Sequence, residues 1–406
     1  MHKCRVCSNN IEKFMSFGKM PIANAFLKKE EFKDEYFFEL APSFCNKCFT
    51  FQIIDQPDPN KMFHENYTFF TRSSKFMVKH FNLFANDIYD RFLKNLNQPM
   101  VIEIGSNDGA YLEFFSKKNI SHLGIEPSAN VAKVAKSYGV NSLVSFMNLE
   151  TSKKILNKYR KADAITAANV ICHIPNINEF AESISNILDD NGVFVFEEPY
   201  LGSMIEKNSY DQIYDEHVYI FSALSIQSIF SNFGMELFDL QHQSTHGGSM
   251  RYFLCKKGKK IINKSVDNIL LKEKEQNLNK DDVFLKFKQN IEKSKIDLKN
   301  LLNQIKKNNK LVAGYAATSK STTILNYCDI DEDLMPCIFD TTPTKINKYS
   351  PGKHIPIKDH KYFQEAKLDY AFLFAWNHYE EIKKKEQKFI SKNGKWITHV
   401  PEIKVY

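Results

Sequence analysis

Four cysteines near the start of the chain have the spacing of a metal site. Cys4 and Cys7 form one C-x2-C pair, and Cys45 and Cys48 form a second. Zinc prefers tetrahedral thiolate coordination, and two such pairs supply two ligands each from tight turns. Because four cysteine ligands leave no open coordination position, we predict a structural Zn²⁺ site. The alternatives are two disulfides, which a cytosolic context disfavours, and chance clustering.

A second candidate site lies in VIEIGSNDG, residues 101–109, at a predicted strand-to-helix turn. Glycines there let the backbone approach a ligand closely, and a carboxylate at the strand end can bind an amino group or a hydroxyl. After the next predicted strand, Glu126 in GIEPS is placed to accept hydrogen bonds from a ribose diol. The E-x-G-x-x-x-G spacing differs from the dinucleotide fingerprint. With ADAITAANVICHIP, residues 162–175, these segments favour an S-adenosylmethionine site like that of class I methyltransferases.

A dense group of ionisable side chains occurs in QIYDEHVYIFS, residues 212–222. The imidazole of His217 has a pKa near neutral and can take a proton, while Tyr214 can stabilise or relay developing negative charge. Glu216 can orient the imidazole. The alternative interpretation is a solvated helix end.

The segment THGGSMR, residues 245–251, combines two glycines with several donors. Gly247 and Gly248 free backbone N–H groups, and His246, Ser249 and Arg251 add side-chain donors. Such a turn suits a phosphate or sugar hydroxyls. An ordinary β-turn is the alternative.

The elements that position these residues alternate along the chain. Apolar strands and amphipathic helices alternate over residues 99–255, with a helix from about residue 74 and another through residues 180–192, which predicts a mostly parallel, doubly wound α/β sheet. We expect a zinc-binding domain (1–70), an S-adenosylmethionine-binding methyltransferase domain (71–255), a linker formed by a long amphipathic helix (256–308) and a smaller Rossmann-like α/β domain that contributes to substrate binding (309–406).

Composition excludes several classes of protein. The 406 residues are 43% hydrophobic and 25% charged, which excludes collagen-like, low-complexity and disordered chains. Apolar runs are too short for a membrane helix, and MHKCRVCSNN lacks the apolar core of a signal peptide. We therefore expect a cytoplasmic protein without a membrane partner. The net charge of +7 is spread along the chain, so we expect no nucleic-acid partner.

Motifs along nearly the whole chain resemble those of a known family. Besides the cysteine pairs, they are EIGSNDG, GIEPS, NVICHIP, EEPY, YDEHVYIFS, HGGSMR, GYAATSKSTTILNYC and SPGKHIPI. In this order they resemble the nucleotide-sugar C-methyltransferases, the sugar 3-C-methyltransferases of deoxysugar pathways. The resemblance implies a zinc-binding amino-terminal domain, a central S-adenosylmethionine domain and a carboxy-terminal α/β domain. It also implies methylation at C3 of a 4-keto sugar carried on a nucleoside diphosphate, with inversion at that carbon.

The resemblance assigns roles to the residues of the third site. It implies that His217 is the general base at C3, that Tyr214 stabilises the enolate oxygen or assists proton transfer, and that Glu216 orients the base or contacts the sugar. His173 and Tyr67 are further catalytic candidates. No metal needs to act chemically.

Binding residues follow from the same resemblance. The cofactor candidates lie at predicted strand ends and the turns after them: Glu103, Gly105, Asn107, Asp108, Gly109, Glu126, Pro127, Ser128 and Asn169. The candidates for the sugar nucleotide are Glu198, Tyr200, His246, Gly248, Ser249, Arg251 and Lys320. Lys320 is expected to meet the diphosphate because it opens a predicted helix and helix N-termini attract anions. A solvated lysine is the alternative.

The sequence departs from the family pattern at three places, one of which is A-T-S-K, residues 317–320, in place of a turn that contains glycine. Phe69 stands where the family usually has a second tyrosine, and Asp340-Thr341-Thr342-Pro343 replaces Asp-Asn-Pro. The identity of the sugar and of the nucleoside base therefore stays open, and so does the oligomeric state, although one chain is large enough to enclose the site.

Two other functions are alternatives to C-methylation. An O- or N-methyltransferase of a sugar or small molecule would need a base but no enolate. A zinc ribbon that binds nucleic acid would concentrate basic residues around the cysteine pairs, whereas residues 1–60 mix Lys with Glu and Asp.

Overall fold

A seven-stranded sheet lies at the centre of the computed structural model, which describes residues 2–58 and 70–406. Its strand order is β13-β14-β11-β10-β7-β8-β9, and β14 is antiparallel to both of its neighbours while the other pairs are parallel. The strands are β7 (Met100–Ile104), β8 (Ser121–Ile125), β9 (Ser142–Leu143), β10 (Ala162–Ala168), β11 (Leu188–Pro199), β13 (Met235–Gln243) and β14 (Ser249–Lys256). This confirms the predicted doubly wound sheet. The order reverses between β7 and β10, where such sheets bind ligands at the carboxyl ends of their strands.

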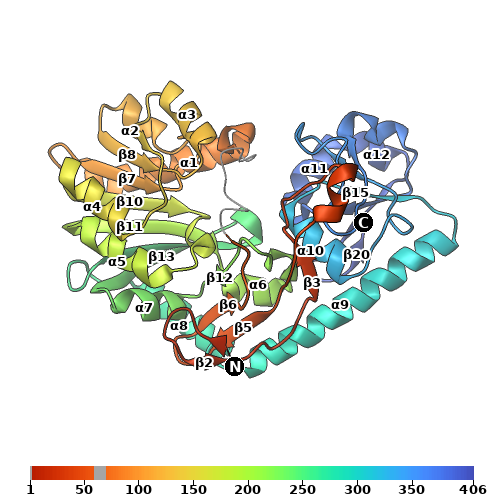
Figure 1. Cartoon of the computed structure of the whole chain (residues 1–406), viewed down its shortest axis with the longest axis horizontal. Helices are drawn as coiled ribbons and strands as arrows, with labels where there is room; N and C mark the ends of the chain where they lie inside the picture. The colour runs from red at the N-terminus through yellow and green to blue at the C-terminus, as the bar shows by residue number, and fades with distance from the viewer. Residues whose placement is uncertain (1, 59–69) are drawn as a thin grey trace.

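Helices cover both faces of this sheet because successive strand residues point to opposite faces (Figure 1). Val101 packs in a cluster with Phe84 of α1, whereas its neighbour Ile102 packs in a second cluster with Phe180 of α5. The helices are α1 (Lys75–Ile88), α2 (Glu113–Lys117), α3 (Ala129–Ser137), α4 (Leu149–Lys158), α5 (Ile177–Ile187), α6 (Leu201–Lys207) and α7 (Ala223–Ser231). The helix expected over residues 180–192 ends at Ile187, because Leu188 already pairs with Ala162 in the sheet.

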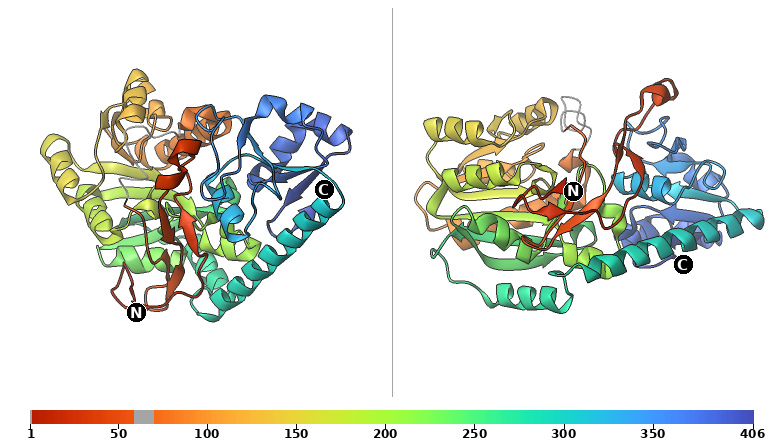
Figure 2. Two further views of the ribbon diagram at one scale, coloured as in Figure 1. Left: turned by 45° about the vertical axis from the view of Figure 1, so that its right-hand side comes forward. Right: turned by 60° about the horizontal axis from the view of Figure 1, so that its bottom comes forward.

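The amino-terminal module consists of small antiparallel sheets. Its strands are β1 (His2–Lys3), β2 (Asn10–Ile11), β3 (Lys19–Pro21), β4 (Phe37–Glu39), β5 (Pro42–Cys45) and β6 (Thr50–Ile53). A strand from the methyltransferase part, β12 (Tyr219–Ile220), pairs with β6 and completes a three-stranded sheet. The module runs between the two α/β units (Figures 1 and 2). Its core therefore joins that of the methyltransferase part.

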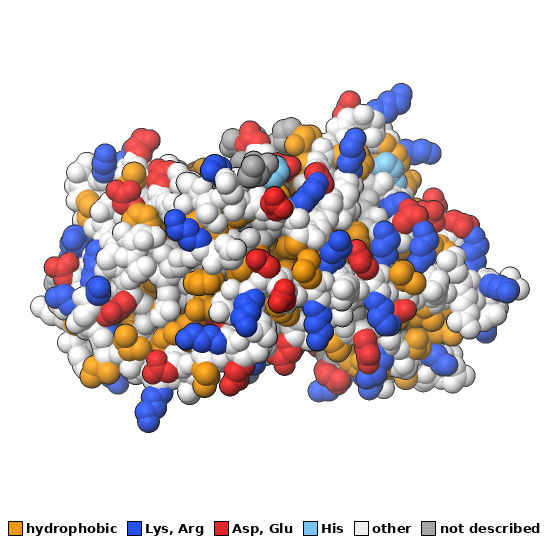
Figure 3. Space-filling model, turned by 90° about the horizontal axis from the view of Figure 1, so that it is seen from below, with side chains coloured by type: hydrophobic (Ala, Val, Ile, Leu, Met, Phe, Trp, Pro, Cys, Tyr) orange, Lys and Arg blue, Asp and Glu red, His pale blue; other side chains and the backbone are white. Residues whose placement is uncertain are grey.

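Two helices connect the α/β units where one long helix was expected. They are α8 (Lys264–Glu275) and α9 (Asp282–Lys307), and Asn277 between them has a left-handed φ of 56°. The apolar face of α9 packs on the amino-terminal module, where Phe284 stacks on Phe44 with ring centroids 4.3 Å apart. Seen from below, both signs of charge are mixed over the molecule (Figure 3). Along α9 several lysines pair with acids, as Lys299 does with Asp329.

The carboxy-terminal unit is a second α/β sheet of six strands with the order β17-β16-β15-β18-β19-β20, parallel except for β20. Its strands are β15 (Val312–Tyr315), β16 (Ile338–Asp340), β17 (Ile357–Asp359), β18 (Tyr370–Leu373), β19 (Lys395–Thr398) and β20 (Lys404–Val405). Its helices are α10 (Ser319–Tyr327), α11 (Tyr379–Lys385) and α12 (Gln387–Ser391). Thr318 caps α10 by accepting a hydrogen bond from Ser321 N. Within residues 2–58 and 70–406, no helix has both the length and the apolar character needed to cross a bilayer.

Candidate active site

The four cysteines predicted to bind metal lie together in the amino-terminal module. The Sγ atoms of Cys4 and Cys48 are 3.5 Å apart, as are those of Cys7 and Cys45, and all four lie within 4.8 Å of one another. A disulfide would bring two sulfurs to about 2.05 Å. Tetrahedral Zn²⁺ with Zn–S bonds of about 2.3 Å separates its sulfurs by about 3.8 Å. The cluster therefore fits zinc, and the disulfide alternative is wrong.

Neighbouring groups favour thiolates at this cluster. Gln52 Nε2 and the backbone N–H of Val6 both donate to the sulfur of Cys4, at 3.1 and 3.4 Å. Such donors orient and stabilise metal ligands. None of the four cysteines lines the large cavity described next. The metal therefore holds the module together and does not reach the reacting atoms.

A cavity of about 1470 Å³ lies at the carboxyl ends of the strands of both α/β units. It exceeds the roughly 300–1,000 Å³ of a typical single-ligand site, so it has room for two ligands. All three parts of the chain contribute to its wall, including Asn24 from the amino-terminal module and Lys345 from the carboxy-terminal unit. Of the residues predicted as catalytic or binding, the cavity is lined by Glu103, Gly105, Asn107, Glu126, Pro127, Ser128, Asn169, His173, Tyr214, Glu216, His217, His246 and Lys320.

The turn after β7 forms one end of the cavity. Gly105 has a φ of 67°, and a Cβ atom there would lie 2.2 Å from Val170 Cγ2, so only glycine fits. Glu126, at the end of β8, accepts hydrogen bonds from Asn107 N at 2.9 Å and Ser128 N at 2.8 Å. These two bonds hold its carboxylate at the cavity wall, where a diol can donate to it.

Two buried acceptor oxygen atoms lie beside this turn. Among the described residues, neither Glu103 Oε2 nor Asn169 Oδ1 has a hydrogen-bond partner. Burial raises the pKa of Glu103 well above its ordinary value, and the nearby charges of Asp108 and Glu126 raise it further. Buried polar groups are normally satisfied. A ligand ammonium group would satisfy both acceptors and compensate the negative charge, so this end of the cavity fits S-adenosylmethionine.

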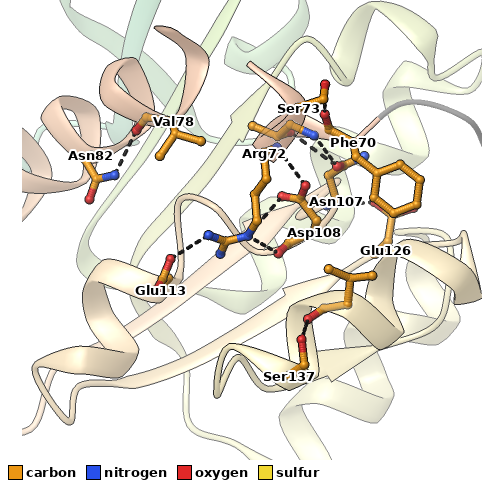
Figure 4. Close-up of polar contacts among 12 residues, drawn as sticks. Phe70, Arg72, Ser73, Val78, Asn82, Asn107, Asp108, Glu113, Glu126 and Ser137 are labelled. Atoms are coloured by element: carbon orange, nitrogen blue, oxygen red, sulfur yellow. Dashed lines mark hydrogen bonds and ion pairs between the residues drawn. The ribbon is translucent and has the colours of Figure 1, made fainter. Parts of the chain in front are cut away.

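The segment Phe70–Ser74 packs against the same turn (Figure 4). Thr71 N donates to Asn107 Oδ1 at 3.0 Å, and Arg72 N donates to Asp108 Oδ2 at 2.8 Å. Asp108 therefore faces Arg72 and does not line the cavity, contrary to its predicted contact with the cofactor. Gly109 also lies behind the turn, against Val140 and Ala135. Tyr67 lies outside the described residues.

The side chains of Tyr214 and His217 form a hydrogen-bonded pair in the cavity wall. His217 Nδ1 lies 2.8 Å from the carbonyl oxygen of Gln212, which can only accept, so Nδ1 carries the proton. The lone pair is then on Nε2, which accepts from the Tyr214 hydroxyl at 2.8 Å. The orienting group is thus the Gln212 carbonyl, whereas Glu216 accepts a hydrogen bond from Asn24 Nδ2 at 2.6 Å.

The two histidines of the site are neutral at physiological pH. Burial lowers the pKa of His217 well below its ordinary value, and the neighbouring His173 lowers it further. Burial also lowers the pKa of His173 to about 4. The two rings stack with centroids 5.5 Å apart. A neutral imidazole whose Nε2 lone pair is released by the Tyr214 hydroxyl can accept a proton from a substrate.

Two lysines of the carboxy-terminal unit face the cavity. Lys320 lies in the first turn of α10, half-buried, with Nζ 3.4 Å from Asn377 Oδ1. Lys345 Nζ donates to Ala317 O at 2.7 Å. Burial lowers the pKa of both ammonium groups, and an anion in the cavity would offset that cost. The alternative of a solvated surface lysine is therefore wrong for Lys320.

Several residues predicted to bind the sugar nucleotide lie outside the cavity lining. Glu198 accepts hydrogen bonds from Val170 N and Ile171 N, and Tyr200 donates to Glu273 at 2.9 Å. These side chains are buried beneath the cavity wall, where they stabilise the fold.

The segment THGGSMR contributes one side chain to the cavity, that of His246, which has a left-handed φ of 52°. Ser249 Oγ donates to Thr245 O at 3.1 Å, and Arg251 Nε donates to Glu197 at 2.6 Å. Gly248 packs against Ser203. Gly248, Ser249 and Arg251 do not line the cavity, and β14, which begins at Ser249, carries the last two into the sheet.

Three sequence-family models match the chain in succession. Their descriptions are "Putative zinc binding domain" for residues 4–63, "Methyltransferase domain" for residues 77–240 and "C-methyltransferase C-terminal domain" for residues 244–401. A curated relative, the C-methyltransferase NovU of Streptomyces niveus, is 28% identical over 99% of this chain and 96% of its own length.

Solved S-adenosylmethionine-dependent methyltransferases match less than half of the chain. One from Clostridium acetobutylicum is 14% identical over 45% of this chain and 92% of its own, with a TM-score of 0.35. One from Anabaena variabilis is 15% identical over 44% of this chain and 95% of its own, also with a TM-score of 0.35. The family of the chain is therefore inferred from the strand order, the cysteine cluster and the three family models that match successive segments. The chain belongs to the C-methyltransferases that combine a zinc-binding module, an S-adenosylmethionine-binding methyltransferase domain and a C-methyltransferase C-terminal domain.

Proposed function

We propose that this C-methyltransferase methylates C3 of a 4-keto sugar carried on a nucleoside diphosphate, through an enolate. The observation that carries the proposal is the hydrogen-bonded series from the Gln212 carbonyl through His217 to Tyr214, placed in a cavity large enough for two ligands. A carbon atom becomes nucleophilic only when a proton beside a carbonyl is removed. A neutral imidazole next to a phenol hydroxyl supplies the base and the donor that this step needs.

The proposed reaction begins with removal of the C3 proton. The C3–H bond breaks, its proton goes to His217 Nε2, and the electron pair forms the enolate, whose oxygen accepts a hydrogen bond from the Tyr214 hydroxyl. His217 keeps its orientation through Nδ1, which still donates to Gln212 O. When bound, S-adenosylmethionine supplies an electrophilic methyl group on sulfonium. Transfer of that methyl group to C3 would break its bond to sulfur, and the residues of this chain would supply much of the acceleration by positioning C3.

The cofactor is proposed to occupy the end of the cavity at β7 and β8. Glu103 Oε2 and Asn169 Oδ1 would accept from the ammonium group of its amino-acid part, since both are buried acceptors without a protein donor. The Glu126 carboxylate would accept from the ribose hydroxyls. Gly105 leaves space for the ligand because a side chain at that position would collide with Val170.

The diphosphate is proposed to lie at the opposite wall, beside Lys320 and Lys345. Both ammonium groups face the cavity, and the first turn of α10 adds backbone N–H groups. This places the base between a cofactor subsite and an anion subsite. Such an order suits a sugar held by its nucleoside diphosphate with C3 toward the sulfonium.

Product analysis tests the proposed function. The purified protein would be incubated with trideuteromethyl-labelled S-adenosylmethionine and a panel of 4-keto nucleotide sugars, and the products analysed by mass spectrometry and NMR. We expect a labelled methyl group bonded to C3. A methyl group on oxygen or nitrogen would overturn the enolate mechanism and favour the O- or N-methyltransferase alternative.

A further inference from the structure

The segment Ile22–Phe26 of the amino-terminal module lies between the two α/β units. Ala23 N donates to Asp215 Oδ1 at 2.9 Å on the methyltransferase side, and Ala23 O accepts from Thr322 Oγ1 at 2.8 Å on the carboxy-terminal side. Phe26 lies beneath Lys345, whose Nζ is 4.6 Å from the ring centroid. Hydrogen bonds to Ala23 thus join the amino-terminal module to residues about 190 and 300 positions away in the two α/β units.

We propose that Asn24 is a positioning residue for Glu216, so that the zinc-stabilised module completes the active site. Asn24 Nδ2 donates to Glu216 Oε1 at 2.6 Å, and both side chains line the cavity beside His217. This inference rests on the proposed function and on the contact with the sugar that the family resemblance implies for Glu216, whose carboxylate would accept a sugar hydroxyl. The hydrogen bond from Asn24 fixes the direction in which the carboxylate faces.

The charges around Glu216 explain why an amide occupies position 24. Asp215 is adjacent, and Lys345 and the Cys172 thiol also interact with Glu216. Burial and the charge of Glu216 raise the pKa of Asp215 above its ordinary value. Burial raises the pKa of Glu216 as well, while the hydrogen bond from Asn24 and the charge of Lys345 lower it. Asn24 therefore helps to keep Glu216 ionised.

The backbone around Asn24 holds the amide in place. Ala23 is bonded on both sides, and Leu27 exchanges two backbone hydrogen bonds with Tyr349, at 3.2 and 2.8 Å. Asn24 thus lies in a short segment whose two ends are fixed by hydrogen bonds. Because the carboxylate it contacts lies beside the base, a small change at position 24 reaches the site of proton removal without removing a catalytic group.

Three variants separate positioning from folding. Asn24→Ala removes the donor, and Asn24→Asp places a carboxylate next to that of Glu216. Asn178→Ala is the matched control, because Asn178 Nδ2 donates to Val6 O at 2.8 Å and ties α5 to the same module away from the cavity. For both Asn24 variants we expect kcat/KM for the sugar nucleotide to fall roughly tenfold or more, with S-adenosylmethionine affinity and zinc content unchanged. Asn178→Ala should leave kcat/KM within about twofold.

The pH profile gives a readout that a merely structural role would not change. Because the Asn24 bond lowers the pKa of Glu216, its loss raises that pKa, and the acid limb of kcat/KM should move to higher pH in Asn24→Ala but not in Asn178→Ala. An unchanged limb, or equal losses in both variants, would overturn the proposal.

A substrate-independent titration distinguishes this proposal from the proposed function. The Glu216 carboxyl would be followed by ¹³C NMR in protein with labelled glutamate, with its signal assigned by Glu216→Gln. We expect its pKa to rise in Asn24→Ala whether or not any keto sugar is turned over. If the pKa stays the same, the positioning role is wrong even when C3 methylation is demonstrated.

Discussion

The Tyr214 hydroxyl donates to Nε2 of His217 across 2.8 Å, while Nδ1 of the same ring donates to the Gln212 carbonyl at 2.8 Å. The imidazole is thereby held in one tautomer, with its lone pair on the nitrogen that faces the cavity. A substrate carbonyl that takes over the Tyr214 hydroxyl would leave Nε2 free to accept a proton. This exchange of partners links enolate stabilisation to the base.

Replacing the base should separate chemistry from cofactor binding. In His217→Asn we expect turnover to fall by roughly 10²–10⁴-fold, the range typical of general-base catalysis. Affinity for S-adenosylmethionine, measured by calorimetry, should stay within about twofold, because the cofactor end of the cavity does not use His217. Unimpaired turnover would remove His217 from the base role.

Removing the hydroxyl of Tyr214 should lower kcat more than it raises KM. Tyr214→Phe keeps the ring but loses the donor to Nε2 and to the enolate oxygen. We expect a fall in kcat of about 10²-fold, because donors to developing oxyanions act mainly in the transition state. Tyr219→Phe is the matched control, since Tyr219 does not line the cavity and its hydroxyl donates to Pro175 O and not to the base. Equal effects of the two variants would contradict the role of Tyr214.

Loss of one cysteine ligand should release the zinc and unfold the amino-terminal module locally. Cys45→Ser should reduce the zinc content from about one ion per chain to near zero, because three thiolates hold Zn²⁺ far less well than four. Atomic absorption measures the metal, and limited proteolysis measures unfolding of the module. Cys337→Ser, at a buried cysteine outside the cluster, is the control. A zinc content unchanged in Cys45→Ser would contradict the four-cysteine assignment.

The anion subsite predicts a selective effect on the sugar nucleotide. Lys320→Ala removes an ammonium group that faces the cavity and should raise KM for the sugar nucleotide about tenfold or more, with little change in the affinity for S-adenosylmethionine. Lys348→Ala, in the same unit but outside the cavity lining, provides the control. If inorganic diphosphate inhibits the wild type and Lys320→Ala equally, the subsite does not involve Lys320.

The raised pKa of the buried Glu273 should make the stability of the fold depend on pH. It is buried, accepts from Tyr200 and from the backbone N–H groups of Ala223 and Leu224, and burial raises its pKa from 4.5 to about 7. Between these two values the folded state keeps a proton that the unfolded state releases. Its contribution to stability is therefore fully present below the unfolded pKa and is lost as pH rises through the folded pKa.

Urea denaturation across pH tests this dependence. Replacing Glu273 by Gln should flatten the fall in the free energy of unfolding between pH 4.5 and about pH 7, by at most about 3 kcal/mol. Glu275→Gln, on the exposed side of α8, should keep the wild-type slope. A slope that is the same in Glu273→Gln as in the wild type would show that Glu273 does not titrate as inferred.

Local patterns in the sequence predicted part of the site. The cysteine pairs, the glycine turn and the Tyr214–His217 group are each set by spacing within a few residues, and the structure brings each group together. Asn24 and Lys345 were missed because their roles depend on contacts between distant segments. The hydroxyl-rich turn after β16, Thr341–Thr344, was the available signal for Lys345, whereas nothing in the sequence near Asn24 indicated its role.

Burial explains why some of the residues predicted to bind a ligand do not line the cavity. Tyr200 and Arg251 follow or belong to sheet strands, but acids from other elements, Glu273 and Glu197, bind them beneath the cavity wall. The partner of Tyr200 lies 73 residues away on α8, where the sequence predicted only a long linking helix. Such long-range pairing cannot be derived from local periodicity.

Exchange of the substrate's C3 proton tests the central claim most directly. A 4-keto nucleotide sugar would be incubated with the protein in deuterated water without S-adenosylmethionine, and the C3 proton followed by NMR, with His217→Asn alongside. We expect deuterium to enter C3 with the wild type and not with His217→Asn. Two results would contradict deprotonation by His217. One is that the wild type methylates C3 but no deuterium enters C3, and the other is that deuterium enters C3 equally with both proteins.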